Sequence, residues 1–306
     1  MFRDPPFYHL KPYLKIMALV MVMIVTFLIV LALGVAVSIP IFGRGLLDSL
    51  ASLTDYSDPL MVSALKYFQI VNQVGVFILP AIIFVVLTDD DFTGYLNLKG
   101  RIKKLSIIFG CILLLISMPF INWLVQINNA INLPSYLAGL ENWMRDSEDK
   151  AQKLTDAFLL TKTWGGLAVN MVMIAVLAAV GEELIFRGIL VKLFREWTGN
   201  IHLAVIIPAL LFSALHLEFY GFFGRLVLGI ILGYLFVWSG SLWVPIAVHF
   251  LNNAMAVIVS FLEHRGLIST NLDSFGSSKN FDIILGSFLL TIFAMSVIYL
   301  HERGYF

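Results

Sequence analysis

Two adjacent carboxylates and an arginine stand inside an otherwise apolar stretch, AAVGEELIFRGIL, between Ala178 and Leu190. Charges inside a membrane are expensive, and those that persist usually serve a function. Glu183 and Arg187 are four residues apart, so on a helix they share a face and can neutralise each other. Glu182 points about 100° away from that pair. The spacing therefore predicts one carboxylate held in an ion pair and a second one left free for chemistry.

Two further polar sites follow in the sequence, His216 in FSALH and the pair His249 and Asn253 in HFLNN. His249 and Asn253 are four apart and share a helix face. At about 1.5 Å per residue from a turn at Thr198, Glu182 and His216 lie at roughly 24 and 27 Å, level with each other. His249 reaches the same level if this hairpin extends further into the cytoplasm. The register thus allows the three sites to converge.

These residue types suit hydrolysis by an activated water. A buried carboxylate can act as a general base, and a nearby imidazole can share its proton or hold a metal. A second histidine and an asparagine amide can donate to a developing oxyanion. The HExxH signature of zinc peptidases is absent. In the alternative interpretation, Glu182 and Glu183 mark a cytoplasmic helix end and His216 lies at the opposite interface.

Composition places the chain among multi-span membrane proteins. Of its 306 residues 59% are hydrophobic and 13% charged, and the mean hydropathy is +0.90. The net charge of zero argues against a nucleic-acid partner. A single cysteine, Cys111, excludes a disulfide framework within the chain and a cysteine-based metal site.

The apolar runs predict an all-α membrane protein with about eight transmembrane helices. Residues 128–164 predict an amphipathic helix at the membrane interface. Gly229 and Gly233 form a GxxxG pair suited to close helix packing. A polar stripe in the second span, formed by Gln69, Asn72 and Gln73, is interpreted as interhelical hydrogen bonding in preference to a ligand site. The expected spans are 16–42, 67–87, 105–127, 167–194, 201–217, 222–238, 242–262 and 283–300.

The spans divide into three regions. Residues 1–163 would form an N-terminal membrane region, 164–262 a catalytic core, and 263–306 a loop and the last span. Lysines and arginines near the span ends favour a cytoplasmic location for both termini. The residues that this orientation places inside are Arg3, Lys11, Lys15, Lys99, Arg101, Lys103, Lys104, Lys192, Arg195 and Arg303.

The segments GEELIFRG, FSALH and HFLNN resemble, in order and spacing, the EExxxR, FxxxH and HxxxN motifs of one family. This is the CPBP family of CAAX proteases and bacteriocin-processing proteins, also called Abi, and the resemblance covers residues 164–262. It implies that Glu182 and His216 activate water and that Glu183 and Arg187 form a supporting pair. It also implies that His249 and Asn253 stabilise the oxyanion.

The family has been described both as metal-free and as zinc-dependent. In a metal-dependent mechanism Glu182, His216 and His249 would bind a divalent metal such as zinc. The resemblance implies a multi-pass protein of the bacterial cytoplasmic membrane whose partners are the lipid bilayer and a membrane-anchored protein or peptide substrate. Eukaryotic members remove the last three residues of prenylated CAAX proteins, and bacterial members act on other substrates or take part in bacteriocin immunity.

Three functions follow as hypotheses. The first is an intramembrane endopeptidase. The second is a non-catalytic membrane scaffold or bacteriocin-immunity protein that keeps the same fold. The third is a proton-coupled transporter, which would favour paired inverted repeats. The first half of the chain holds no second copy of the glutamate or histidine motifs, which disfavours the transporter.

Overall fold

The computed structural model describes residues 4–43, 56, 58–99, 104–269 and 277–305, and these residues form helices with no strand among them. Arg3, Arg101 and Lys103, which supported the predicted orientation, lie outside this part of the chain. The α-helices are α1 (Pro12–Phe42), α3 (Pro59–Gln73), α4 (Leu79–Thr88), α5 (Phe92–Tyr95), α6 (Lys104–Asn129), α7 (Ala138–Leu159), α8 (Trp164–Asn170), α9 (Ala178–Glu183), α10 (Val191–Thr198), α11 (Ile201–Ala214), α12 (Phe222–Ser239), α13 (Trp243–His264) and α14 (Phe281–Glu302). Short 3-10 turns cover Ser135–Leu137 and Phe219–Gly221.

Seven continuous helices in the described residues are long and apolar enough to cross a membrane. The predicted all-α, multi-span character is therefore confirmed. The expected span at 201–217 corresponds to α11, which has only 14 residues. Its length of about 21 Å is less than the roughly 30 Å of a bilayer core. The chain leaves the helix at Ala214, and Leu217 then adopts a left-handed backbone with φ 55°.

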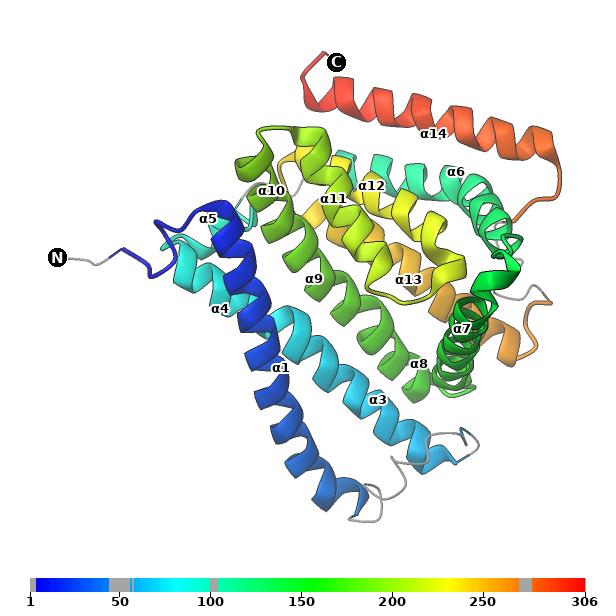
Figure 1. Cartoon of the computed structure of the whole chain (residues 1–306). Helices are drawn as coiled ribbons and strands as arrows, with labels where there is room; N and C mark the ends of the chain where they lie inside the picture. The colour runs from blue at the N-terminus through cyan, green and yellow to red at the C-terminus, as the bar shows by residue number, and fades with distance from the viewer. Residues whose placement is uncertain (1–3, 44–55, 57, 100–103, 270–276, 306) are drawn as a thin grey trace.

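The helix from Trp164 to Thr198 is the most deeply buried of the seven. Figure 1 shows its central part, α9, lying between α3 and α13, with α1 at one edge of the bundle and α14 at the other. The outer helices α1 and α14 expose many large apolar side chains, as lipid-facing helices do. The two glutamates of α9 are thus held in the interior, away from lipid.

Three π-helical segments interrupt the two spans that face each other in the core. Val74–Ile78 separates α3 from α4, and Met171–Leu177 and Leu184–Leu190 flank α9. Such wide turns are rare and occur frequently at functional sites. Here they surround the segment that carries Glu182 and Glu183.

The GxxxG pair of α12 packs against α11, as predicted. An added Cβ at Gly229 would lie 3.0 Å from the Cβ of Ala209, and one at Gly233 would lie 2.7 Å from Cγ1 of Val205. Only glycine allows the two backbones to come this close. The contact fixes α11, and hence Phe212, next to α12.

The polar segment predicted as an amphipathic helix forms α7. Its Trp143 ring lies 5.2 Å from the ring of Phe219, and the Arg145 guanidinium lies 4.8 Å above the ring of Tyr220. Tyr220 also donates its backbone N–H to Glu148 at 3.2 Å. The helix therefore packs on the short turn between His216 and α12; its location at a membrane interface stays a prediction.

Candidate active site

Glu183 and Arg187 form the ion pair that their spacing predicts. Arg187 Nη1 lies 2.6 Å from Glu183 Oε1, and the two side chains are almost completely buried, with exposures of 1% and 0%. Arg187 Nη2 also donates to the carbonyl of Gly229 at 2.9 Å, and its guanidinium lies 5.0 Å from the centre of the Phe212 ring. A charge this deep in a protein must be paired to persist. Arg187 thus ties the glutamate helix to α12 and α11.

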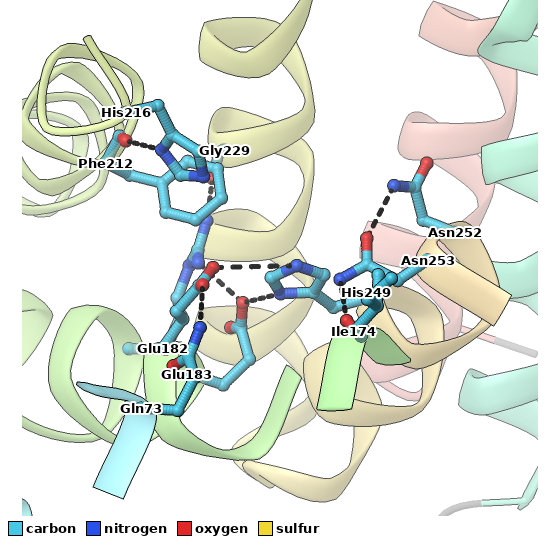
Figure 2. Close-up of polar contacts among 11 residues, drawn as sticks. Gln73, Ile174, Glu182, Glu183, Phe212, His216, Gly229, His249, Asn252 and Asn253 are labelled. Carbon is cyan, nitrogen blue, oxygen red and sulfur yellow. Dashed lines mark hydrogen bonds and ion pairs between the residues drawn. The ribbon is translucent and has the colours of Figure 1, made fainter. Parts of the chain in front are cut away.

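His249 of α13 joins the two glutamates, as Figure 2 shows. Its Nδ1 lies 2.8 Å from Glu183 Oε1, and its Nε2 lies 3.8 Å from Glu182 Oε2. A carboxylate paired with arginine can only accept, so Nδ1 carries the proton in that bond. Glu183 therefore sets the orientation of the imidazole and directs Nε2 toward Glu182.

Glu182 is buried with 7% exposure and has no lysine or arginine partner within the described chain. Its Oε1 accepts a long hydrogen bond of 3.5 Å from Gln73 Nε2, which comes from the end of α3. The polar stripe of the second span does bond between helices, as interpreted, but its partner is the site carboxylate. Sequence reasoning missed this role because Gln73 is 109 residues away and belongs to none of the motifs.

Two buried acceptors border Glu182. Glu183 Oε2 and Gln73 Oε1 are among the few buried side-chain atoms of the described residues that lack a hydrogen-bond partner. Leaving a buried acceptor unpaired costs about 1–3 kcal/mol. The three side chains therefore form a buried polar cluster with spare acceptor capacity for a group that donates hydrogen bonds.

His216 is the predicted site residue that the structure keeps apart from Glu182. It lies just after α11 and is exposed, and among the described residues it has no hydrogen bond or ion pair to either glutamate. Its Nδ1 lies 2.7 Å from the carbonyl of Phe212, so Nδ1 donates; in the neutral imidazole Nε2 then keeps a lone pair. The Phe212 ring is 4.9 Å from the His216 ring and 5.9 Å from that of His249 (Figure 2). The early end of α11 explains why the expected convergence is incomplete.

Asn253 lies one turn beyond His249, and its amide bonds to the helix that carries the glutamates. Its Nδ2 donates to the carbonyl of Ile174 at 3.0 Å, and its Oδ1 accepts from Asn252 Nδ2 at 3.0 Å. Ile174 belongs to the π-helical segment just before α9. The amide thus holds α13 against the glutamate helix.

The proposed metal ligands Glu182, His216 and His249 do not fit a metal site in this arrangement. No group of three His, Cys, Asp or Glu side chains in the described chain is placed to hold an ion. A zinc ion needs donors about 2.0–2.2 Å from one centre. His249 Nε2 faces Glu182, but His216 has no contact with either glutamate, so the three side chains do not converge on one centre.

Part of the chain is similar in sequence to known proteins. Residues 164–255 match the family model described as type II CAAX prenyl endopeptidase Rce1-like, and they include every motif residue of the site. An uncharacterized Bacillus subtilis protein, YpbD, is 28% identical over 99 residues, which are 31% of this chain and 48% of that protein. The matched segment thus spans about half the length of that relative, and no solved structure matches the chain significantly. Residues 164–255 are therefore similar to the Rce1-like family of type II CAAX prenyl endopeptidases.

Proposed function

We propose that this protein is an intramembrane endopeptidase that hydrolyses a peptide bond in a membrane-associated protein or peptide. The observation that carries the proposal is the asymmetry of the two buried glutamates. Glu183 is bound by Arg187 and by His249, whereas Glu182 has only a weak amide contact and faces the imidazole at 3.8 Å. A carboxylate in this setting is free to accept a proton from water.

In the proposed reaction, Glu182 removes a proton from a water molecule as its oxygen attacks the carbonyl carbon of the scissile bond. His249, in its protonated form, donates from Nε2 to the resulting oxyanion while Nδ1 stays bonded to Glu183. Collapse of the tetrahedral intermediate breaks the C–N bond, and Glu182 returns the proton to the leaving amine. The products are one carboxylate end and one amine end. The spare acceptors Glu183 Oε2 and Gln73 Oε1 are suited to orient the water.

We assign His216 and Asn253 supporting roles. With its Nδ1–H held by Phe212, His216 offers Nε2 as a second acceptor for the attacking water. That role requires His216 to approach Glu182 when substrate binds, and catalytic hydrogen bonds often tighten in this way. Asn253 is proposed as a positioning residue, since its contact with Ile174 sets the distance between His249 and the glutamates.

The test compares purified wild type, Glu182→Gln and the control Glu263→Gln in detergent. Glu263 is another carboxylate of the helix bundle, at the C-terminal end of α13. The substrates are a prenylated C-terminal peptide and a set of single-span peptides, each with and without a chelator. Loss of a general base reduces the rate by about 100- to 10,000-fold. We expect this loss in Glu182→Gln only, and no effect of the chelator.

Two results would contradict the proposal. Cleavage by Glu182→Gln at the wild-type rate would remove Glu182 from the mechanism. A folded wild-type protein that cleaves none of the substrates would favour the non-catalytic scaffold. Loss of wild-type activity with the chelator would instead show that a metal takes part and that the ligands rearrange to hold it.

A further inference from the structure

A cavity lies away from the glutamates, where the end of α10 and the start of α11 face α12 and α14. Its volume is about 850 Å³, and none of its lining residues belongs to the group around Glu182. Figure 1 shows α14 at the edge of the bundle, where it packs on α6 and α12. The lining residues come from helices far apart in the sequence; the first of them is Arg195 and the last is Arg303.

One end of this cavity is cationic. Arg195 and Arg303 line it from α10 and from the end of α14, and both side chains are exposed. Neither forms an ion pair within the described residues: Glu196, next to Arg195, pairs with Lys15 at 3.9 Å, and Arg303 lies 5.3 Å above the ring of Tyr299. Glu302 also lines the cavity, and its carboxylate accepts a hydrogen bond from Ser106. Two arginines against one engaged carboxylate leave an excess of positive charge.

Aromatic side chains continue the lining inward from this end. His202 Nδ1 lies 2.7 Å from the hydroxyl of Tyr234, whose ring stacks on that of Trp238 at 5.0 Å. The Trp238 ring in turn meets the edge of Tyr299 at 5.6 Å. Tyrosine and tryptophan are enriched where the apolar bilayer core meets the polar headgroups. The aromatic residues therefore mark the headgroup level.

Further from the cationic end along α14, the wall is apolar at Met295 and Ile292. From Glu302 back to Ile292 the cavity follows ten residues of α14, or about 15 Å of helix. This is half of the roughly 30 Å bilayer core, the depth of one leaflet. A cationic end, an aromatic zone and then an apolar slot, over this total length, match the headgroup and the beginning of an acyl chain of a lipid.

We propose that this cavity binds one anionic phospholipid, with its phosphate between Arg195 and Arg303 and an acyl chain along α12 and α14. Arginine suits a phosphate because its guanidinium donates two parallel hydrogen bonds. The apolar slot distinguishes a lipid from a free phosphate ion. The bound lipid would stabilise the packing of α14 on the rest of the bundle.

The experiment measures binding by native mass spectrometry and thermal stability in detergent, with phosphatidylglycerol, phosphatidylcholine or inorganic phosphate added. The test variant is Arg195→Gln/Arg303→Gln. The control is Arg265→Gln, an exposed arginine that also stacks on aromatic rings but lies at the other end of the bundle, after α13. Arg195→Lys/Arg303→Lys keeps the charge.

We expect wild type and Arg265→Gln to prefer phosphatidylglycerol over phosphatidylcholine. The double glutamine variant should lose roughly 5- to 30-fold in affinity for phosphatidylglycerol alone, and the lysine variant should keep most of the preference. Equal binding of the two lipids, or an unchanged preference in the double glutamine variant, would overturn the proposal. Equal stabilisation by inorganic phosphate would also overturn it, since the apolar slot would then contribute nothing. If the double glutamine variant unfolds, quenching of wild-type tryptophan by brominated phosphatidylglycerol, reduced in Trp238→Phe, decides the question.

Discussion

Replacement of Arg187 by methionine tests whether the buried ion pair is the support of the site. Methionine occupies similar space but leaves Glu183 at 0% exposure with its arginine gone. Breaking a buried pair by removing one partner costs about 3–5 kcal/mol, because the remaining charge is uncompensated. Removing both charges avoids that penalty. We therefore expect Glu183→Gln/Arg187→Met to be more stable than Arg187→Met alone.

The assay is a double-mutant cycle on the free energy of unfolding, measured by titration with SDS in mixed micelles. The expected coupling energy is about 2–3 kcal/mol, the upper range for residues in direct contact. The control cycle uses Glu141 and Arg145 of α7, which have the same spacing and a comparable distance of 2.8 Å but lie at the surface, with Arg145 exposed and Glu141 partly exposed. Water screens an exposed pair, so its coupling should be far smaller.

The cycle also separates stability from activity. The double variant removes the carboxylate that orients His249, so it should stay inactive even where its stability recovers. Additive effects of the two buried substitutions, or a coupling as small as that of the exposed pair, would refute the reasoning on stability. Wild-type cleavage by the double variant would refute the positioning role of Glu183.

Three further predictions concern the surroundings of the site. Gln73→Leu should lower kcat/KM by roughly 2- to 10-fold, the worth of one weak hydrogen bond, whereas Gln69→Leu in the same stripe should not; equal effects would count against the contact with the glutamate. Burial raises the pKa of the Glu148 carboxyl above its usual 4.5, so the folded protein binds this proton more tightly than the unfolded chain. Stability should therefore fall as pH rises from about 4 toward neutral. If the melting temperature of Glu148→Gln fell with pH as steeply as that of wild type, the assignment would be disproved. Gly229→Ala should cost about 1–3 kcal/mol through its clash with α11. Gly286→Ala, with open space around the new methyl, should be neutral or stabilising, and similar melting temperatures for the two variants would contradict the packing argument.

Much of the fold follows from the chain read locally. Long apolar runs bounded by polar residues predict spanning helices, and most of their limits in the structure differ from the predicted ones by at most four residues. The second span departs further, since its helix begins at Pro59, eight residues before the predicted start. The run that begins at Ile201 departs in another way. Its hydrophobicity extends to Leu217, but the helix ends at Ala214. Where a helix stops in an apolar stretch depends on the turn that follows and on its neighbours, which composition does not record.

The sequence by itself also determined the Glu183–Arg187 pair and the separate position of Glu182, because contacts between residues four apart depend only on the geometry of one helix. Contacts between helices were decided by the tertiary structure. The packing of α3 and α13 on α9 brings Gln73 and His249 to the glutamates, and the end of α11 leaves His216 on the far side of the Phe212 ring. Such distances depend on how close two helices pack and how each is rotated, and no single segment of sequence encodes them.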